Sequence, residues 1–240
     1  MLIEIWSDVV CPWCLVGKRR LEAALAEFDH ADDVTVRWRS FQLDPSAPVS
    51  DPDVPGDHAA HLGEKYGGGR EAGLAMLDQM TQVAAQDGLE FRLDRATGRN
   101  TLDAHRLLHA AASADDGYAL QGELKERLLQ AYMRDGERID DPSVLERLAV
   151  EAGLDADVVR EVLSCDVYAG EVAADQAEAA AMGAHGVPFV VLDRRYGVSG
   201  AQPVDVFTRA LEQAWADRSP VTVLAGGDDA AGCGPDGCAI

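Results

Sequence analysis

Two cysteines separated by two residues carry the strongest chemical signal in the sequence. Cys11-Pro-Trp-Cys14 follows a short apolar, β-prone run at Leu2–Trp6 and precedes a segment with helical spacing of leucines. Pro12 suits the first position of a helix, so Cys11 is expected at the N-cap, where free backbone N–H groups and the helix dipole stabilise a thiolate. Such motifs lower a cysteine pKa from about 8.5 to roughly 3.5–7.5. We therefore expect an exposed Cys11 that attacks a disulfide and a partly buried Cys14 that resolves the mixed disulfide.

Two other interpretations of this cysteine pair stay open. A two-residue gap also suits half of a tetrahedral zinc site, and two cysteines can simply pack in a core. The position between a strand and a helix favours redox chemistry over both. Within the motif, Pro12 starts the helix, and Trp13 either shapes a peptide-binding surface or packs.

A proline at the start of a predicted strand is the second signal. Pro188, in Gly186-Val187-Pro188, opens an apolar run that ends at Leu192, and proline is unusual in a central strand. A cis Val187–Pro188 bond would explain it, and the Val187 backbone would then be free to pair with a substrate strand. The simpler alternative is a trans proline at an edge strand. The upstream cysteine motif and the following hairpin favour the cis form.

The elements that must position these residues form an α/β part and a helical part. Residues 1–45 have a β–α–β pattern typical of a parallel strand pair. Strand character returns at Val187–Leu192, turns at 193–195 and pairs back at Tyr196–Ser199, before a final helix opened by Pro203. We expect a discontinuous α/β domain at 1–50 and 184–220, a helical insertion at 51–183, and a Gly-rich tail at 221–240.

The insertion is predicted to hold six helices. Their signals are apolar spacing, a capping pair at Asn100 and Asp103, and a first-turn proline at 142 capped by Asp140 or Asp141. The predicted segments are Ala59–Gln86 (weakened at Gly67–Gly69), one starting at Asn100, Leu120–Met133, one starting at Pro142, Asp155–Leu163 and Glu171–Met182.

A second cysteine pair lies in the tail, in Cys233-Gly-Pro-Asp-Gly-Cys238. Its glycines and proline allow a tight turn that brings two sulfurs within disulfide range. This pair could serve as a secondary redox pair that relays electrons to Cys11 and Cys14, because a flexible tail gives a high effective concentration. An exposed disulfide without a partner and a four-cysteine zinc site are the alternatives. Cys165 is expected to be a small buried residue without a role.

Composition limits the function classes. The 240 residues carry 21 Lys and Arg against 42 Asp and Glu, a net charge of −21, which disfavours nucleic acids and anionic membranes. Hydrophobic residues at 47% and charged residues at 26% indicate a folded chain. The start has neither a basic region nor a long apolar stretch, so we expect a cytoplasmic protein, where structural disulfides are rare. A homodimer is one candidate assembly.

Several weaker candidates surround the motif. His105 could line an active-site cleft, although a histidine at helical spacing is more often packed. Asp8 and Glu4 precede the motif, and a carboxylate close to Cys11 would oppose thiolate formation. Gln42 and Asp44 follow the second strand and could approach the cleft.

Motifs along nearly the whole chain, from Leu2 to Trp215, resemble the DsbA-like thioredoxin superfamily. More narrowly, they resemble its FrnE-like subgroup of cytoplasmic dithiol–disulfide oxidoreductases. The motifs are Cys11-Pro-Trp-Cys14, Phe41-Gln-Leu-Asp-Pro45, Asn100-Thr-Leu-Asp-Ala-His-Arg-Leu107, Gly186-Val-Pro-Phe189 and Ser199-Gly-Ala-Gln202. This resemblance implies a thioredoxin fold with an inserted all-helical domain, catalysis by Cys11 and Cys14, and a cis Pro188 beside them. Some members of the subgroup also carry a C-terminal Cys-x4-Cys.

The functional hypothesis is a thiol–disulfide oxidoreductase or isomerase that requires no organic or metal cofactor. Its partner would be a protein or a small molecule that contains a disulfide or a dithiol. A glutathione-dependent transferase or isomerase, of the kappa or 2-hydroxychromene-2-carboxylate isomerase type, is the first alternative. Those enzymes typically carry Ser where this chain has Cys11. A zinc-structured, redox-regulated binding protein is the second alternative.

Overall fold

One mixed β-sheet organises the molecule. The computed structural model describes residues 1–47, 57–96, 99–115 and 117–218. Within these ranges the strands are β1 (Leu2–Ser7), β2 (Thr35–Ser40), β3 (Phe189–Leu192) and β4 (Tyr196–Ser199), in the order β2-β1-β3-β4. β1 pairs in parallel with β2 and antiparallel with β3, which forms a hairpin with β4. The predicted β–α–β start and the predicted hairpin are both confirmed.

Helices account for most of the remaining described residues. They are α1 (Pro12–Ala26), α2 (His58–Tyr66), α3 (Gly69–Gln86), α4 (Leu102–Ala112), α5 (Gly117–Gln130), α6 (Pro142–Ala152), α7 (Ala156–Ser164), α8 (Ala169–Ala181) and α9 (Val204–Ala216). A π-helical turn at Ala131–Asp135 extends α5. None of the described helices is both long and apolar enough to cross a membrane.

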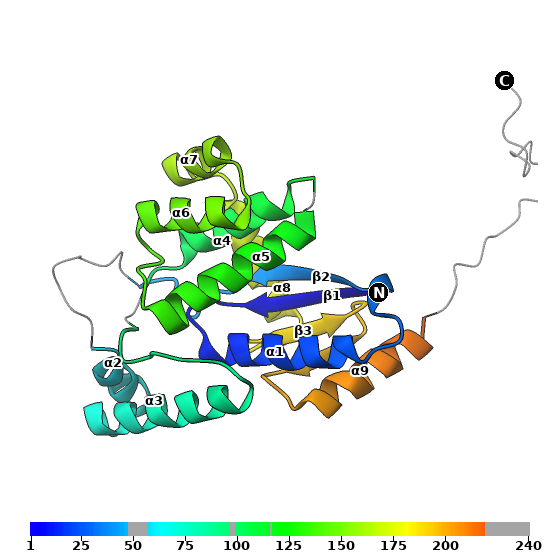
Figure 1. Cartoon of the computed structure of the whole chain (residues 1–240), viewed down its shortest axis with the longest axis horizontal. Helices are drawn as coiled ribbons and strands as arrows, with labels where there is room; N and C mark the ends of the chain where they lie inside the picture. Colours follow the sequence, from blue (N-terminus) through cyan, green and yellow to red (C-terminus); the bar gives the residue numbers. More distant parts are fainter. Residues whose placement is uncertain (48–56, 97–98, 116, 219–240) are drawn as a thin grey trace, which may run out of the picture.

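The alternation of side chains along β1 separates the two faces of the sheet. Ile3 and Ile5 join a buried cluster with Phe207 and Leu211 of α9, and α1 contributes Leu21 to the same cluster. Trp6 faces the other way and packs with Ala179 of α8. Figure 1 accordingly shows α1 and α9 side by side on one face of the sheet and α8 behind it. This arrangement is a thioredoxin-like fold with added helices, as predicted.

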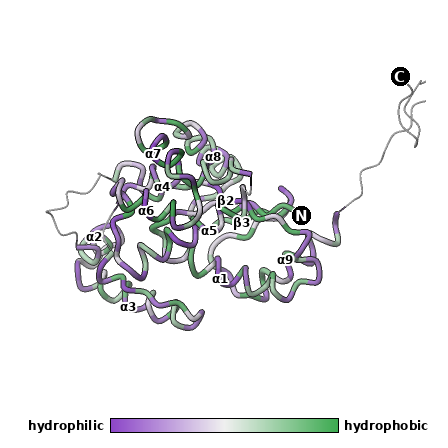
Figure 2. Tube along the Cα trace, turned by 45° about the horizontal axis from the view of Figure 1, so that its top comes forward, coloured by the Kyte–Doolittle hydropathy of each residue, from purple (hydrophilic) through white to green (hydrophobic). Residues whose placement is uncertain are grey.

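A third and larger buried cluster joins the cysteine motif to the inserted helices. Cys11, Cys14 and Leu15 pack in the same cluster as Leu107 of α4 and Leu128 of α5. Figure 2 shows hydrophilic and hydrophobic stretches alternating along these helices, as expected where one side of each helix is buried. The sheet and the insertion therefore share apolar packing around the cysteines, and the predicted domain boundaries stay a prediction.

The predicted helix at Ala59–Gln86 is two helices. Gly67 and Gly68 have positive φ, a conformation that ends α2 and turns the chain back into α3. The two helices lie very close, because a Cβ at Gly63 would be 1.8 Å from the Gly69 carbonyl oxygen and one at Gly73 would be 1.9 Å from the Ala59 carbonyl oxygen. Figures 1 and 2 both place this α2–α3 pair at the end of the molecule away from α9.

The helix starts follow the sequence signals with one correction. Pro142 opens α6, and the Asp141 carboxylate accepts from the Ser143 N–H, as predicted. The N-cap of α4 is Thr101 rather than Asn100. The Asn100 side chain still accepts from the Leu102 N–H, but its amide donates to the Ala47 carbonyl and so joins two loops.

Candidate functional site

The cysteine motif sits at the start of α1, directly after β1. Cys11 is the N-cap with extended backbone angles, and Pro12 occupies the first helical turn, as the sequence predicts. The Cys14 N–H donates to the Cys11 carbonyl over 3.0 Å. Both side chains are free thiols. Cys11 therefore stands where backbone N–H groups and the helix dipole favour negative charge.

The Val187–Pro188 peptide lies against Cys11 and is cis, which confirms the second prediction. The Cys11 thiol donates to the Val187 carbonyl, with 3.7 Å between sulfur and oxygen. Gly17, on α1, allows this loop to approach the helix, because a Cβ there would lie 2.9 Å from Pro188 Cγ. Two segments far apart in the sequence thus meet at one sulfur.

The expected exposure of Cys11 is wrong. Cys11 is 4% exposed and Cys14 is 1% exposed, so both thiols are buried. The physical reason is that the loop of Val187 covers the Cys11 sulfur from one side and the core cluster holds it from the other. Cys11 is reached through a cavity beside it rather than from open solvent.

Three fully buried charged or polar side chains lie next to the thiols: Asp8, His105 and Lys125, here called the dithiol cluster. The Asp8 carboxylate accepts from the Val9 N–H at 2.8 Å, the Leu43 N–H at 2.7 Å and His105 Nε2 at 3.2 Å. Lys125 Nζ donates to the Ser7 carbonyl over 3.3 Å.

The charges within the dithiol cluster shift several pKa values. Burial raises the pKa of Asp8, but hydrogen bonds from His105 and Leu43 and the charge of Lys125 outweigh it and hold that pKa below its ordinary value. Burial lowers the pKa of His105 below its ordinary value, although the hydrogen bond with Asp8 and the charge of Asp8 oppose this shift. Burial also lowers the pKa of Lys125 to about 8, against the opposing charges of Cys14 and Asp8.

The two thiols ionise as one pair. Burial alone would raise the pKa of Cys14, but the hydrogen bond with Cys11 and the charge of Lys125 lower it. The pKa of Cys11 is raised well above its ordinary value by its hydrogen bond with Cys14, by burial, and by the charges of Cys14 and Asp8. Against the predicted lowering, burial and the neighbouring Cys14 and Asp8 therefore oppose ionisation of Cys11, and the two thiols titrate as a pair. The predicted opposition of Asp8 to a Cys11 thiolate is confirmed.

The weaker sequence candidates divide between the core and the cavity wall. His105 is packed behind Asp8 and does not line the cavity, which corrects its placement in a cleft. Glu4 faces α8, where it pairs with Arg39 and Arg194. Gln42 is buried, and its backbone N–H donates to the Gln176 side chain, whereas Asp44 does line the cavity.

Sequence reasoning missed Lys125 of the dithiol cluster. A signal was present, because Gln121, Leu124, Lys125, Leu128 and Leu129 share the buried face of α5 at helical spacing. A lysine inside an otherwise apolar stripe is an unusual buried charge, which often marks a functional site.

A second set of buried polar groups lies one helical turn further along α4. His109, Asp175, Arg39 and Ser40 form this set, here called the sheet cluster. The Asp175 carboxylate contacts His109 Nε2 at 3.1 Å, Arg39 at 2.8 Å and the Ser40 N–H at 2.8 Å. It ties α8 and α4 to β2 on the face of the sheet that carries Trp6.

The cavity beside Cys11 has a volume of about 860 Å³. Asp8, Cys11, Trp13 and Val187 line one side of it, and α2 and α3 line another. Trp13 is 44% exposed, so of the two alternatives it does not pack in the core. The apolar part of the wall comprises Val10, Leu43, Ala47, Leu62, Met76, Leu77, Met80 and Leu93.

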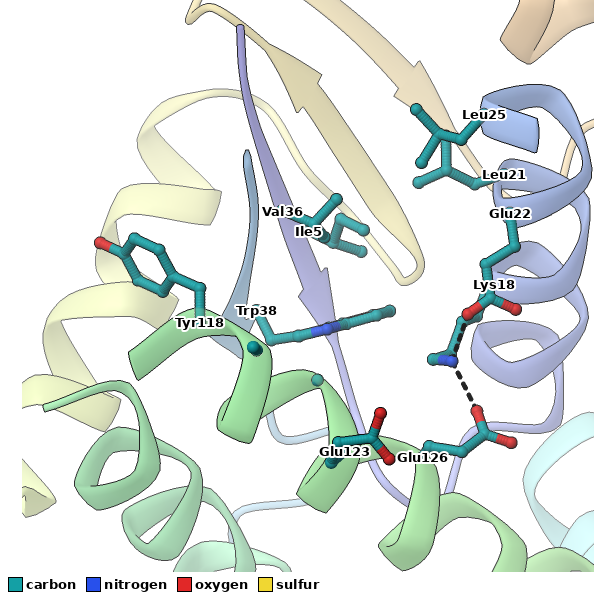
Figure 3. Close-up of a pocket in the computed structure, with 12 residues that line it drawn as sticks. Ile5, Lys18, Leu21, Glu22, Leu25, Val36, Trp38, Tyr118, Glu123 and Glu126 are labelled. Atoms are coloured by element: carbon teal, nitrogen blue, oxygen red, sulfur yellow. Dashed lines mark hydrogen bonds and ion pairs between the residues drawn. The ribbon is translucent and has the colours of Figure 1, made fainter. Parts of the chain in front are cut away.

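A smaller pocket of about 240 Å³ lies between α1, β2 and α5 (Figure 3). Figure 3 shows Lys18 of α1 reaching both Glu22 and Glu126, with the Trp38 ring across the pocket. Lys18 Nζ is 2.6 Å from Glu126, and Arg19 also pairs with Glu126. Burial alone would raise the pKa of Glu126, but these cations lower it to about 2. This contact fixes α1, which carries the cysteines, to the helix that carries Lys125.

The remaining cysteines divide into one described residue and two that are not. Cys165 ends α7 and is exposed, contrary to the expected burial, and its thiol donates to the Glu161 carbonyl. Cys233 and Cys238 lie outside the described residues, so the relay and the four-cysteine zinc site stay untested. Among the described residues, no group of three or more His, Cys, Asp or Glu is placed to hold a metal ion.

Comparisons with known proteins agree with this geometry. The sequence model for the DSBA-like thioredoxin domain matches residues 2–212. A probable DsbA oxidoreductase from Streptomyces coelicolor is 47% identical, with a TM-score of 0.86 over 100% of this chain and 99% of its own. Two more distant structures share the fold. A 2-hydroxychromene-2-carboxylate isomerase is 14% identical, with a TM-score of 0.65 over 89% of this chain and 95% of its own. The cytosolic disulfide reductase DsbM from Pseudomonas aeruginosa, solved with GSH, is 22% identical, with a TM-score of 0.59 over 90% and 100%.

Proposed function

Because the chain belongs to the DSBA-like thioredoxin domain family, we propose that it is a dithiol–disulfide oxidoreductase that works through Cys11 and Cys14. The observation that carries this proposal is the meeting of two free thiols at a helix start with the carbonyl that precedes Pro188, 3.7 Å from the Cys11 sulfur. Residence in the cytoplasm is part of the proposal, and the cytosolic reductase with the same fold is compatible with it.

The reaction begins with the sulfur of Cys11. As the Cys11 thiol gives up its proton, its sulfur attacks one sulfur of the substrate disulfide. The substrate S–S bond breaks, and the leaving thiolate takes up a proton. Cys14 then loses its proton and attacks the Cys11 sulfur of the mixed disulfide. This step releases the second substrate thiol and leaves a Cys11–Cys14 disulfide, so two electrons have passed to the substrate.

Two neighbours of the thiols assist this exchange in different ways. Lys125 supplies a buried positive charge that stabilises the thiolate at Cys14. The Val187 N–H and carbonyl offer the substrate chain a strand-like partner beside the sulfur. The carbonyl already accepts from the Cys11 thiol, and a substrate N–H would take its place.

The test compares three single variants in the reduction of insulin disulfides and in the refolding of a scrambled disulfide protein. Cys11→Ser should abolish both activities, and Cys14→Ser should leave a trapped mixed disulfide. Cys165→Ser, which changes an exposed thiol on α7, should retain full activity. Full activity in Cys11→Ser would overturn the proposal.

A glutathione-dependent transferase or isomerase is the second candidate, and the large cavity beside Cys11 favours it. The two functions respond differently to one substitution. If glutathione chemistry were the main activity, Cys11→Ser would preserve the addition of glutathione to 1-chloro-2,4-dinitrobenzene. Under the main proposal, neither protein adds glutathione to this acceptor.

The tail cysteines belong to the proposal as a relay. Thiol titration and steady-state turnover of the double variant Cys233→Ser/Cys238→Ser test this role. Slower turnover or a longer-lived mixed disulfide in the double variant supports the relay. If both the turnover rate and the lifetime of the mixed disulfide are unchanged, the tail cysteines have no relay role.

A further inference from the structure

The wall of the cavity beside Cys11 includes a largely buried cation that has no hydrogen-bond acceptor among the described residues. Arg99 lines this cavity, and its side chain is 11% exposed. Its guanidinium donates no hydrogen bond to any described residue, and its Nε is fully buried. A buried guanidinium without an acceptor carries a large desolvation penalty. A ligand that brings an acceptor would remove that penalty.

Asp140 compensates this cation only in part. Its carboxylate lies 3.6 Å from Arg99, beyond hydrogen-bond distance, and 3.9 Å from Arg138. Arg138 is also 3.9 Å from the Asp141 carboxylate, whereas Asp140 is the one described carboxylate that pairs with Arg99. Burial lowers the pKa of Arg99, and the charge of Asp140 only partly opposes that shift.

The other carboxylates at the cavity wall are already occupied. Asp57 accepts from the Ala60 N–H and pairs with Arg70, and Asp44 accepts from Ser46. The Asp8 carboxylate already accepts three hydrogen bonds, from Val9, Leu43 and His105. Lys65 on α2 and Arg99 are therefore the Lys and Arg side chains of the described wall, and Arg99 is the one whose Nε is buried without an acceptor.

We propose that this cavity binds a low-molecular-weight disulfide that carries a carboxylate, with the carboxylate on Arg99 and the disulfide at Cys11. The proposal rests on the dithiol function proposed above and names its substrate class. A volume of about 860 Å³ lies within the range of small-molecule sites. The apolar wall suits the carbon chain between the two polar ends.

The reaction balances without a further reactant. The reduced protein and one small disulfide give the Cys11–Cys14 disulfide and two small thiols. The two protons of the protein thiols pass to the products. A single turnover can therefore be followed by mixing the reduced full-length protein with the disulfide and recording tryptophan fluorescence.

The probes are three small disulfides of similar size and different charge: 3,3′-dithiodipropionate, 2-hydroxyethyl disulfide and cystamine. Each rate constant is divided by that of dithiothreitol with the same disulfide, which removes intrinsic reactivity. The expected order is dianion first, neutral second and dication last, with the dianion preferred about tenfold or more over the neutral disulfide. The net charge of −21 favours the opposite order by long-range attraction, and added salt screens that effect.

Arg99→Gln should lower the normalised rate of the dianion about tenfold and leave the neutral disulfide within about twofold. Arg99→Lys should restore part of the preference, because the charge remains without the planar fork. Arg209→Gln is the matched control, since Arg209 is 67% exposed on α9 and pairs with Asp205. It should change none of the three rates.

Each outcome separates this inference from the proposed function. A wild-type protein that reacts with none of the three disulfides overturns the function itself. A protein that reduces the neutral disulfide through Cys11 but prefers cystamine, or an Arg99→Gln variant that slows all three equally, overturns the anion site alone. If Arg99→Gln does not fold, the charge order of the wild-type protein decides.

Discussion

The dithiol cluster and the sheet cluster are two versions of one arrangement on α4. His105 and His109 are one turn apart, and each contacts a buried carboxylate through Nε2, at 3.2 Å from Asp8 and 3.1 Å from Asp175. The two clusters differ in how their cation is paired. Arg39 pairs directly with Asp175, whereas Lys125 makes its hydrogen bond to a backbone carbonyl and stands next to Cys14.

This difference separates a structural role from a chemical one. In the sheet cluster, the Asp175 carboxylate lies within hydrogen-bond distance of Arg39 and His109, and these contacts hold α8 and α4 against the sheet. In the dithiol cluster, backbone N–H groups satisfy the carboxylate, and the cation remains available to a thiolate. A buried cation without a carboxylate hydrogen bond is poorly suited to stability and well suited to holding charge on sulfur.

The largest expected effect is on stability and comes from the sheet cluster. Asp175→Ala should lower the free energy of unfolding by about 3 kcal/mol, because Arg39, His109 and the Ser40 N–H lose a shared buried acceptor. Urea unfolding measures it. Asp205→Ala, at an exposed pair on α9, should stay within about 0.5 kcal/mol. A slowed thiol alkylation in Asp175→Ala would contradict the separation of the two clusters.

The next effect concerns acid stability at the contact shown in Figure 3. The pKa of Glu126 is lowered to about 2 in the folded protein, so its contribution is present above the ordinary value of 4.5 and is lost as pH falls toward 2. Glu126→Gln should lower the free energy of unfolding by about 2 kcal/mol near neutral pH, where Glu126 is ionised. The difference between the two proteins should shrink steadily below about pH 4.5. A constant difference across this range would show that the charge of Glu126 contributes little.

The third effect is on thiol reactivity and comes from the dithiol cluster. Lys125→Met removes the positive charge near Cys14 and should raise the pKa of the first thiol to ionise by about one unit. Alkylation by iodoacetamide near neutral pH should then slow about tenfold. Unfolding should be little affected or become harder, because a buried charge is replaced by an apolar chain. An unchanged alkylation rate would remove Lys125 from the chemistry.

The smallest effect compares the two histidines directly. His105→Leu removes a donor from Asp8, whose less compensated charge should raise the pKa of the thiol pair by about half a unit. His109→Leu is the matched variant one turn away and should leave that pKa unchanged, although both variants lose stability. His105→Gln, which keeps an N–H donor, should restore the pH profile. Equal shifts in both leucine variants would mean that His105 acts only through packing.

The positions of Cys11 at a helix start and of Pro188 before a hairpin could be predicted from the sequence because their signals are local. Pro12 fixes a helix start, and the alternation from Val187 to Ser199 encodes a hairpin. The burial of Cys11 was not predictable in this way, since it depends on the loop of Val187, 176 residues away.

The surroundings of the thiols depend on tertiary contacts. Lys125 and Arg99 both come from the predicted insertion. Lys125 faces the thiols because of how α5 packs against the sheet, and Arg99 faces the cavity because of how the loop before α4 packs. The break of one predicted helix into α2 and α3 was signalled by Gly67 and Gly68. The tight approach of the two helices at Gly63 and Gly73 emerged only from the structure.

The most direct test of the account is to trap the mixed disulfide. The Cys14→Ser variant, with Cys165, Cys233 and Cys238 also changed to Ser, is reduced and mixed with 2-hydroxyethyl disulfide, and its intact mass is measured. We predict one mercaptoethanol adduct on Cys11, whereas the parent with Cys14 restored forms an internal disulfide and carries no adduct. A Cys14→Ser protein that stays unmodified while the parent oxidises would contradict attack by Cys11.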